Sequence, residues 1–323
     1  MLPLPPIDPQ LEAALALAEP LPLTLEDLPA RRAEQLRRSL SQAPLPSPEI
    51  QTEEHRVPRP DGEGEVMLKL YRPAGAAGTL PALLWFHGGG YVGGTVVLDD
   101  VLCEELARDV RCVVLSVEYR LAPEDPYPAG LEDAFTALCW AANRAGSLGI
   151  DAGRIAIGGA SAGAGLTASL ALLARDRGGP RPRLQLLLYP MLDRDTSRDP
   201  ALVSGEGEHP FWPHHHNRLA WQAYTGHLAD PTQARYASPV HFADLTALPP
   251  AWVGTGDLDL FHDEDRRYAE RLRQAGVPTV FRCFPGAYHG FDRAAPEASL
   301  SRQFRADYTA ALRTALRPET GPL

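Results

Sequence analysis

The sequence predicts an α/β fold in which helices cover both faces of a mostly parallel sheet. Short apolar runs typical of strands alternate with amphipathic stretches typical of helices over residues 66–284. One of these strands runs into a glycine-rich turn at Ser161, which an apolar helix follows. The 323 residues suffice for one large domain with additions. In such folds ligands bind at the carboxyl ends of the strands.

The first 60 residues are predicted to form two short helices, over residues 11–18 and 25–40. Thr24 is the expected N-cap of the second helix, and acidic residues follow it. Prolines then interrupt regular structure at Pro44, Pro46 and Pro48. Both helices are apolar on one face and need a surface to lie on. We therefore expect residues 1–60 to be an N-terminal cap segment.

Seven segments of the remaining chain have the apolar, β-branched composition of buried strands. They are residues 66–71, 80–86, 112–117, the run from Arg154 into Ser161, 184–189, 251–254 and 280–284. Helices are expected between them at residues 97–110, 131–144, 166–174 and 263–275. The last helix begins with acidic residues and ends with Arg273 before Gly276 and Pro278, as helix-end preferences require.

The alternation lapses between two parts of the predicted core, residues 61–192 and 236–323. Residues 193–235 comprise a polar loop over 194–209 and a helix around 219–224, and we expect this insertion to complete the cap. His214, His215 and His216 precede that helix. Consecutive side chains cannot all face one ion, and no acidic or cysteine partner lies at ligand spacing. We therefore expect a polar helix start here and no metal.

Gly159-Ala-Ser161-Ala-Gly163 has the G-x-S-x-G form of a nucleophile elbow. Such a turn holds the serine hydroxyl clear of the sheet, and the helix N-terminus directs backbone donors at a developing negative charge. A phosphate-binding turn is the alternative. The glycines match neither G-x-G-x-x-G nor the P-loop, which favours a nucleophilic Ser161.

A serine nucleophile needs a base and an acid that orients the base. In α/β hydrolases the chain order is serine, acid, histidine, and both partners follow strands. His289 lies just after the strand at 280–284 and is the expected base. Asp259 is the preferred acid because its loop position lets it reach across to His289, with Asp257 as the alternative. Asp263 and Glu264 are expected to supply charge at a helix start.

Phe86-His-Gly-Gly-Gly-Tyr-Val-Gly-Gly94 directly follows the strand at 80–86 and has the form of an HGGG oxyanion motif. Glycines allow backbone N–H groups to face a substrate without side chains in the way. The expected oxyanion donors are the N–H groups of Gly88, Gly89 and Ala162. His87 is expected to anchor the loop.

Composition limits which cellular compartment and which binding partners are expected. The formal net charge of −10 and the absence of a basic stripe argue against nucleic acid. Four widely spaced cysteines without a C-x-x-C pair indicate free thiols, which fits the cytoplasm. We find no pattern typical of a signal peptide. No apolar run approaches the roughly 20 residues that span a bilayer.

Together these motifs resemble the hormone-sensitive-lipase-like branch of the α/β-hydrolase esterases, known as bacterial family IV. The matching blocks, in family order, are His87-Gly-Gly-Gly90, Tyr119-Arg-Leu-Ala-Pro-Glu124, Gly159-Ala-Ser-Ala-Gly163, Asp259-Leu-Phe-His-Asp-Glu264 and His289-Gly-Phe291. The resemblance implies an eight-stranded, mostly parallel sheet with a helical cap, supports Asp259 as the acid, and implies a structural role for residues 119–124. It also implies no cofactor.

The expected function is a serine carboxylesterase that hydrolyses short- to medium-chain esters through an acyl-enzyme. The small-molecule ester is the expected partner, and the chain is expected to be a monomer or a homodimer. The same triad could serve an amidase, an arylformamidase or a sugar-ester deacetylase. A non-catalytic receptor on the same fold is a second alternative, disfavoured because Ser161, Asp259 and His289 are all present.

Overall fold

A computed structural model describes residues 5–17, 24–42, 47–197, 209–228 and 234–318. Some predicted features lie outside these ranges. They are the helix end at Ala18, the prolines Pro44 and Pro46, and most of the polar loop at 194–209.

The described residues form one eight-stranded sheet in the order β1-β2-β4-β3-β5-β6-β7-β8. The strands are β1 (Ile50–Pro58), β2 (Glu65–Pro73), β3 (Leu80–Phe86), β4 (Val113–Glu118), β5 (Ile150–Ala160), β6 (Gln185–Leu188), β7 (Ala251–Gly256) and β8 (Thr279–Phe284). The β1–β2 and β2–β4 pairs are antiparallel, and every other neighbouring pair is parallel. The predicted α/β fold with a mostly parallel eight-stranded sheet is confirmed.

The strand β1 was not among the predicted segments. Only Ile50 and Val57 of its nine residues are buried, so it carries little apolar pattern. It forms one edge of the sheet through antiparallel pairing with β2, with Ile50 opposite Pro73. The cap segment predicted for residues 1–60 therefore extends too far, because its last part belongs to the sheet.

The helices are α1 (Pro9–Leu17), α2 (Leu28–Gln42), α3 (Asp100–Val110), α4 (Ala129–Asn143), α5 (Ala162–Asp176), α7 (His214–Thr225), α8 (His262–Gln274), α9 (Phe291–Ala294) and α10 (Ser299–Ala315). The predicted helix at 97–110 is divided into a 3₁₀ turn, Val96–Asp99, and α3. Helix α10 was not among the helices predicted from the sequence. Its buried residues Phe304, Tyr308 and Leu312 recur every four positions, a signal that could have revealed it.

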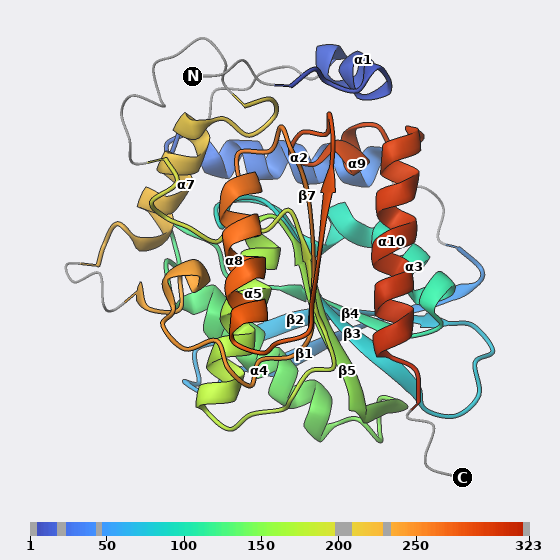
Figure 1. Ribbon diagram of the computed structural model, residues 1–323. Coiled ribbons are helices and arrows are strands. Elements are labelled where there is room, and N and C mark those ends of the chain that lie inside the picture. The colour runs from blue at the N-terminus through green and yellow to red at the C-terminus, as the bar shows by residue number, and fades with distance from the viewer. Residues whose placement is uncertain (1–4, 18–23, 43–46, 198–208, 229–233, 319–323) are drawn as a thin grey trace.

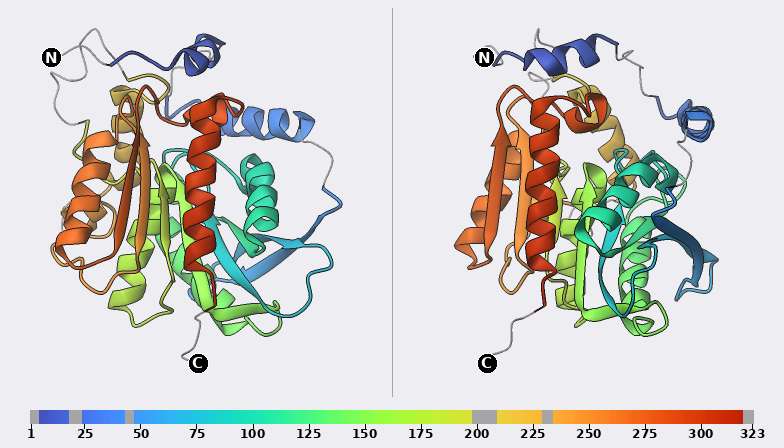
Figure 2. Two further views of the ribbon diagram at one scale, coloured as in Figure 1. Left: turned by 45° about the vertical axis from the view of Figure 1, so that its right-hand side comes forward. Right: turned by 90° about the vertical axis from the view of Figure 1, so that its right-hand side faces the viewer.

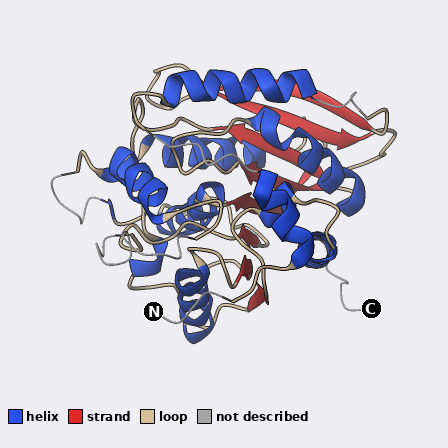
Figure 3. Ribbon diagram, turned by 90° about the horizontal axis from the view of Figure 1, so that it is seen from above, coloured by secondary structure: helices blue, strands red, loops and turns tan. Residues whose placement is uncertain are grey.

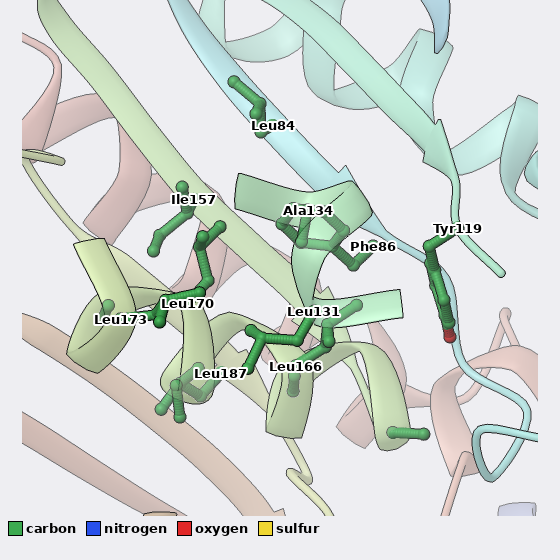
Figure 4. Packing of buried hydrophobic residues seen from close by; sticks show 14 of the residues in the cluster. Leu84, Phe86, Tyr119, Leu131, Ala134, Ile157, Leu166, Leu170, Leu173 and Leu187 are labelled. Carbon is green, nitrogen blue, oxygen red and sulfur yellow. The ribbon is translucent and has the colours of Figure 1, made fainter. Parts of the chain in front are cut away.

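The helices cover the two faces of the sheet (Figure 2). On one face, buried residues of α3 and α10 pack in one cluster with Trp85 and Leu186. On the other face, α4, α5 and α8 contribute to a second cluster. Figure 4 shows Leu166, Leu170 and Leu173 of α5 among residues of β3, β5 and α4. Each fully buried leucine contributes about 1.5–3 kcal/mol, so this packing holds the strand ends in place.

The helices α1, α2 and α7 lie at the upper end of the molecule in Figure 1, toward which the parallel strand β8 points. Figure 3 views this end from above. The Leu11 side chain of α1 is fully buried, and its carbonyl accepts the Tyr288 hydroxyl at 3.2 Å. Helix α2 begins at Leu28, three residues later than predicted, and the expected N-cap Thr24 instead accepts the Asp27 N–H at 3.2 Å in the turn before it. No helix within the described ranges has the length and apolar character needed to cross a membrane.

Candidate active site

Ser161 lies at the turn between β5 and α5, with φ 57° and ψ −121°. A non-glycine residue rarely adopts a positive φ, because the side chain then crowds its own backbone. Here β5 and α5 are both buried and hold the turn from either side. The result is a hydroxyl held above the carboxyl end of β5, directly before the first turn of α5.

Glycine is required on either side of Ser161 for steric reasons. A Cβ at Gly163 would overlap the carbonyl oxygen of Phe86, at the end of β3. A Cβ at Gly159 would lie 2.5 Å from the Gly163 backbone and 2.6 Å from the same Phe86 oxygen. The elbow therefore presses against the strand that leads into His87 and the oxyanion glycines.

His289 follows β8, and its ring contacts both of its predicted partners. The Nε2 atom lies 2.9 Å from Ser161 Oγ, and Nδ1 lies 2.9 Å from Asp259 Oδ2. A carboxylate only accepts hydrogen bonds, so Nδ1 carries the hydrogen and Nε2 is left to accept the serine hydroxyl. The three side chains form a continuous chain of hydrogen bonds.

Asp259, rather than Asp257, reaches His289 from the loop after β7. The second Asp259 oxygen accepts the N–H of Phe261 at 2.9 Å, which fixes the orientation of the carboxylate. Asp257 instead accepts the N–H of Gly286 at 2.7 Å. The two aspartates thus hold the same His289 loop, one through its side chain and one through its backbone.

Aromatic rings surround the imidazole. Tyr189 and Phe261 present near-perpendicular rings to it, with centroids 4.9 Å and 5.0 Å away. Ser161, Asp259 and His289 are only 7%, 2% and 4% exposed. Electrostatic interactions are stronger where water is excluded, so this environment strengthens the hydrogen bonds of the cluster.

A further buried carboxylate, Asp292, lies close to this cluster. Its Oδ1 accepts the Tyr189 hydroxyl at 2.9 Å. Burial raises the pKa of Asp292 to about 6, and the hydrogen bond from Tyr189 opposes that rise. The sequence analysis did not identify this pair, since neither residue belongs to a motif with a known chemical role.

The predicted oxyanion donors lie around Ser161. A Cβ at Gly88 would come within 3.4 Å of the Ser161 Cβ, so the Gly88 backbone adjoins the nucleophile. Within the described ranges, the backbone hydrogen bonds outside helices and strands leave the N–H groups of Gly88 and Gly89 unused. Ala162 is the first residue of α5, where the N–H has no intrahelical acceptor. No backbone hydrogen bond from the described part of the chain therefore occupies these three N–H groups, which leaves them able to bind an oxygen.

Tyr119 and His87 hold the start of the oxyanion loop. The two rings stack with centroids 4.3 Å apart, and the Tyr119 hydroxyl donates to the His87 carbonyl at 2.7 Å. Burial lowers the pKa of His87, which keeps the ring neutral. Its Nδ1 lies 2.9 Å from the Gly88 carbonyl oxygen and donates to it. These contacts agree with an anchoring rather than a chemical role.

Glu264 lies in the first turn of α8, where it was expected, but its carboxyl is buried and bonds to another segment. It is 1% exposed and accepts the N–H groups of Leu192 and Asp193 at 2.6 Å and 3.1 Å. Burial raises the pKa of this carboxyl well above its ordinary value. Glu264 therefore fixes the point at which the chain leaves β6 for the insertion.

Two aromatic residues of the insertion reach the site, and the sequence analysis assigned them no role. The Trp212 ring lies 6.3 Å from the His289 ring and covers Gly90, where a Cβ would come within 2.6 Å of the indole. Phe211 has φ 68° and lies 3.2 Å from the Cβ position of Gly290. The sequence signal that could have identified these two residues is a consecutive Phe-Trp pair in an otherwise polar insertion.

One cluster within the described ranges has the composition of a metal site: Asp193, Asp195 and His241, whose ligand-type atoms lie within 4.8 Å of one another. His241 Nε2 is 2.8 Å from one Asp193 oxygen, and the Arg267 guanidinium is 3.2 Å from the other. A guanidinium on the carboxylate supplies the positive charge that a cation would bring. Asp193 therefore joins His241 and Arg267 in a hydrogen-bonded, charge-paired network.

Comparison with known proteins gives consistent results. A family model described as alpha/beta hydrolase fold matches residues 83–293. The chain is 35% identical over 295 residues to carboxylesterase NlhH of Mycobacterium tuberculosis, covering 89% of each chain. It is 37% identical over 236 residues to an ethyl acetate hydrolase of Pseudomonas putida, covering 70% of this chain and 71% of that one.

Among solved structures, a bacterial heroin esterase superposes with a TM-score of 0.89 at 37% identity. The match covers 97% of this chain and 98% of that chain. All three similar proteins are ester hydrolases by name.

Proposed function

This chain belongs to the hormone-sensitive-lipase-like branch of the α/β-hydrolase fold family and is a carboxylic ester hydrolase, and we propose that it acts through Ser161, His289 and Asp259. The observation that carries this proposal is the pair of 2.9 Å contacts from the two nitrogens of His289 to Ser161 and to Asp259. A hydroxyl, an imidazole and a carboxylate in this order can activate a nucleophile at neutral pH.

In the first half of the reaction, Ser161 Oγ attacks the ester carbonyl carbon while His289 Nε2 takes the hydroxyl proton. Asp259 stabilises the imidazolium through Nδ1–H. The tetrahedral intermediate collapses when His289 returns the proton to the alcohol oxygen, and the C–O bond of the ester breaks. The alcohol leaves, and the acyl group remains on Ser161.

In the second half, water attacks the acyl-enzyme and His289 takes its proton. Collapse of the second intermediate breaks the bond to Ser161 Oγ, which recovers its proton from His289. The free carboxylic acid is released and the enzyme is regenerated. Tyr189 and Phe261 keep the imidazole in one plane through both steps.

The negative oxygen of both intermediates is bound by the N–H groups of Gly88, Gly89 and Ala162. Each donor of this type lowers a barrier by about 3–4 kcal/mol. The free N–H groups beside Ser161 support this assignment. The α5 N-terminus adds a favourable field at the same point.

The substrate proposal is a small ester with a short to medium acyl chain. The cap consists of α1 and α2 and of the insertion at 193–235, which includes α7. Trp212 and Phe211 of that insertion stand beside His289 and limit the space for a substrate group there.

The proposal extends to compartment and assembly. All four cysteines are free thiols, which supports the cytoplasm, and fractionation against a cytoplasmic marker tests it. The excess of acidic residues, 41 against 31 basic, supports the absence of nucleic-acid binding. A monomer or a homodimer is expected from light scattering on the purified chain.

Hydrolysis of nitrophenyl esters from acetate to long acyl chains tests the function, with Ser161→Ala as the matched variant. The wild type is expected to prefer short to medium chains. The variant is expected to lose at least ~10⁴-fold in kcat, because loss of the nucleophile removes covalent catalysis. A serine-directed fluorophosphonate is expected to label the wild type and not the variant.

Other outcomes separate the alternatives. Faster turnover of matched amides or formamides than of esters would replace the esterase by an amidase or arylformamidase. Folded protein that neither turns over any ester nor reacts with the fluorophosphonate would contradict the triad proposal and favour a receptor. Substantial turnover by Ser161→Ala would assign the nucleophile elsewhere.

A further inference from the structure

One side chain of the cap reaches the loop that holds the oxyanion donors. Arg32 of α2 donates from Nε to the Val92 carbonyl at 2.7 Å and from Nη2 to the Ala122 carbonyl. Its Nη1 lies 2.9 Å from a carboxylate oxygen of Glu124. The side chain is 23% exposed, and its acceptors lie 60 to 92 positions further along the chain.

The Val92 carbonyl belongs to the same turn as the proposed oxyanion donors. The N–H groups of Val92 and Gly93 donate to the Gly89 carbonyl at 3.1 Å and 2.8 Å. These bonds close a tight turn that begins at Gly89. The Val92 carbonyl and the Gly93 N–H belong to one peptide unit, so Arg32 holds the unit that bonds to the Gly89 carbonyl, one peptide unit after the Gly89 N–H.

The Ala122 carbonyl connects Arg32 to the same turn by a second route. The Ala122 N–H donates to the Tyr91 carbonyl at 2.9 Å. Arg32 is thus connected to two neighbouring residues of the turn. It bonds directly to the Val92 carbonyl, and it bonds to Ala122, whose N–H bonds to the Tyr91 carbonyl. Loss of its guanidinium would leave two backbone carbonyls without this partner.

The turn needs such support because its backbone is strained at Tyr91 and adopts, at Gly89 and Gly90, conformations that favour glycine. Tyr91 has φ 62°, although it is not a glycine, and Gly89 and Gly90 have φ 130° and 63°. Conformations of this kind persist only where the surrounding structure holds them. Tyr119 holds the start of the loop at His87, whereas Arg32 holds its far side.

We propose that Arg32 is a positioning residue for the oxyanion donors, so that the cap helix α2 supports the chemistry as well as covering the site. The inference rests on the proposed esterase function. It deepens that function by assigning part of the oxyanion hole's geometry to a residue outside the hydrolase core.

The two possible roles of α2 have different kinetic signatures. The oxyanion is common to every ester, so displaced donors lower kcat by the same factor for all acyl chains. A helix that only covers the site changes KM, and does so differently for short and long chains. The ester series therefore separates positioning from covering.

The test uses Arg32→Met, which keeps the length of the stem and removes every donor. We expect kcat to fall about 10- to 100-fold, uniformly from acetate to long-chain esters, with KM changed less than threefold. Arg32→Lys retains one charged donor group, and we expect it to recover part of the loss. A trifluoromethyl ketone, whose serine adduct carries the oxyanion, should bind more weakly to Arg32→Met by a similar factor.

Two control variants complete the design. Arg37→Met changes the same helix at an exposed arginine that forms an ion pair with Glu34, and it should match the wild type. Glu124→Gln removes only the half-exposed ion pair and leaves both carbonyl contacts, so its kcat should stay within about twofold. Circular dichroism and thermal unfolding establish that each variant folds.

The possible outcomes separate a failure of the proposed esterase function from a failure of the proposed role of Arg32. An inert wild type overturns the proposed function. An active wild type with unchanged kcat in Arg32→Met, or with a loss that depends on chain length, overturns the role of Arg32 alone. If Arg32→Met does not fold, the same test is applied to Arg32→Lys. The proposed role of Arg32 then requires that kcat and ketone affinity both fall in Arg32→Lys, uniformly across the ester series.

Discussion

The loops that carry Ser161, Asp259 and His289 differ from the helices above them in how they are held. Each of the three residues follows a strand of the parallel sheet and is at most 7% exposed. The cap helix α2, by contrast, buries Leu28, leaves Leu36 and Leu40 36% and 59% exposed, and reaches the oxyanion loop through Arg32. The sheet determines the geometry of the reacting groups, whereas a few long side chains determine where the cap lies.

This difference has a physical basis. Strand ends are fixed by backbone hydrogen bonds and by packing on both faces, so a side chain placed there has little freedom. The short helices of the cap cannot be stable alone and depend on tertiary contacts. We therefore expect changes at the strand ends to affect the chemical step, and changes in the cap to affect selectivity, with Arg32 as the exception that connects the two.

The largest expected effect concerns a residue at the end of a strand and tests whether such residues control the chemical step. Asp259→Asn should lower kcat about 10⁴-fold, because the amide favours the wrong imidazole tautomer and cannot stabilise the imidazolium. Asp257→Asn is the matched control, two positions away. Its side-chain oxygen can still accept the Gly286 N–H, so kcat should remain within a few fold. Equal losses in the two variants would contradict the assignment of Asp259.

A second prediction concerns stability as a function of pH. Burial raises the pKa of Asp292 from 3.8 to about 6, so the folded chain binds this proton more tightly than the unfolded chain. Its contribution to stability is present below about pH 4 and is lost as the pH rises through 6. Asp292→Asn does not titrate, and its amide oxygen can still accept the Tyr189 hydroxyl.

The free energy of unfolding of Asp292→Asn, relative to wild type, should therefore increase by about 2 kcal/mol between pH 4 and pH 7. Urea unfolding of both proteins over this range measures the difference, in which the other titrating groups cancel. A difference that does not change with pH would show that burial does not disfavour the charged form of Asp292.

The smallest expected effect lies in the cap. Trp212→Ala removes the indole that covers Gly90 and lies beside His289. We expect longer or bulkier esters to gain about tenfold in kcat/KM relative to acetate, while kcat for acetate changes little. The same ester series measures it. A uniform fall in kcat would instead place Trp212 with Arg32 as a support of the oxyanion loop.

Much of this molecule could be predicted from local patterns. The elbow at Ser161 was recognisable because its steric demands fall on neighbours two positions away, at Gly159 and Gly163. The buried strands were recognisable from apolar runs. In contrast, β1 carries only two buried side chains and is a strand because β2 offers it a partner.

In the candidate active site, too, local patterns identified some residues, whereas the tertiary structure was needed to assign others. The sequence nominated His289 and favoured Asp259 over Asp257 as the acid, although both lie close together after one strand. The structure directs Asp259 to the imidazole and Asp257 to a backbone N–H.

The sequence by itself determined the α/β class, the positions of seven of the eight described strands and the residue types of the candidate triad. Periodicity and turn sterics act over a few residues, and they can be read from the chain directly. Only the tertiary structure decided that Asp292 meets Tyr189, that Trp212 covers Gly90 and that Arg32 reaches the oxyanion loop. These contacts join segments up to 122 positions apart, and they depend on the packing of the whole sheet.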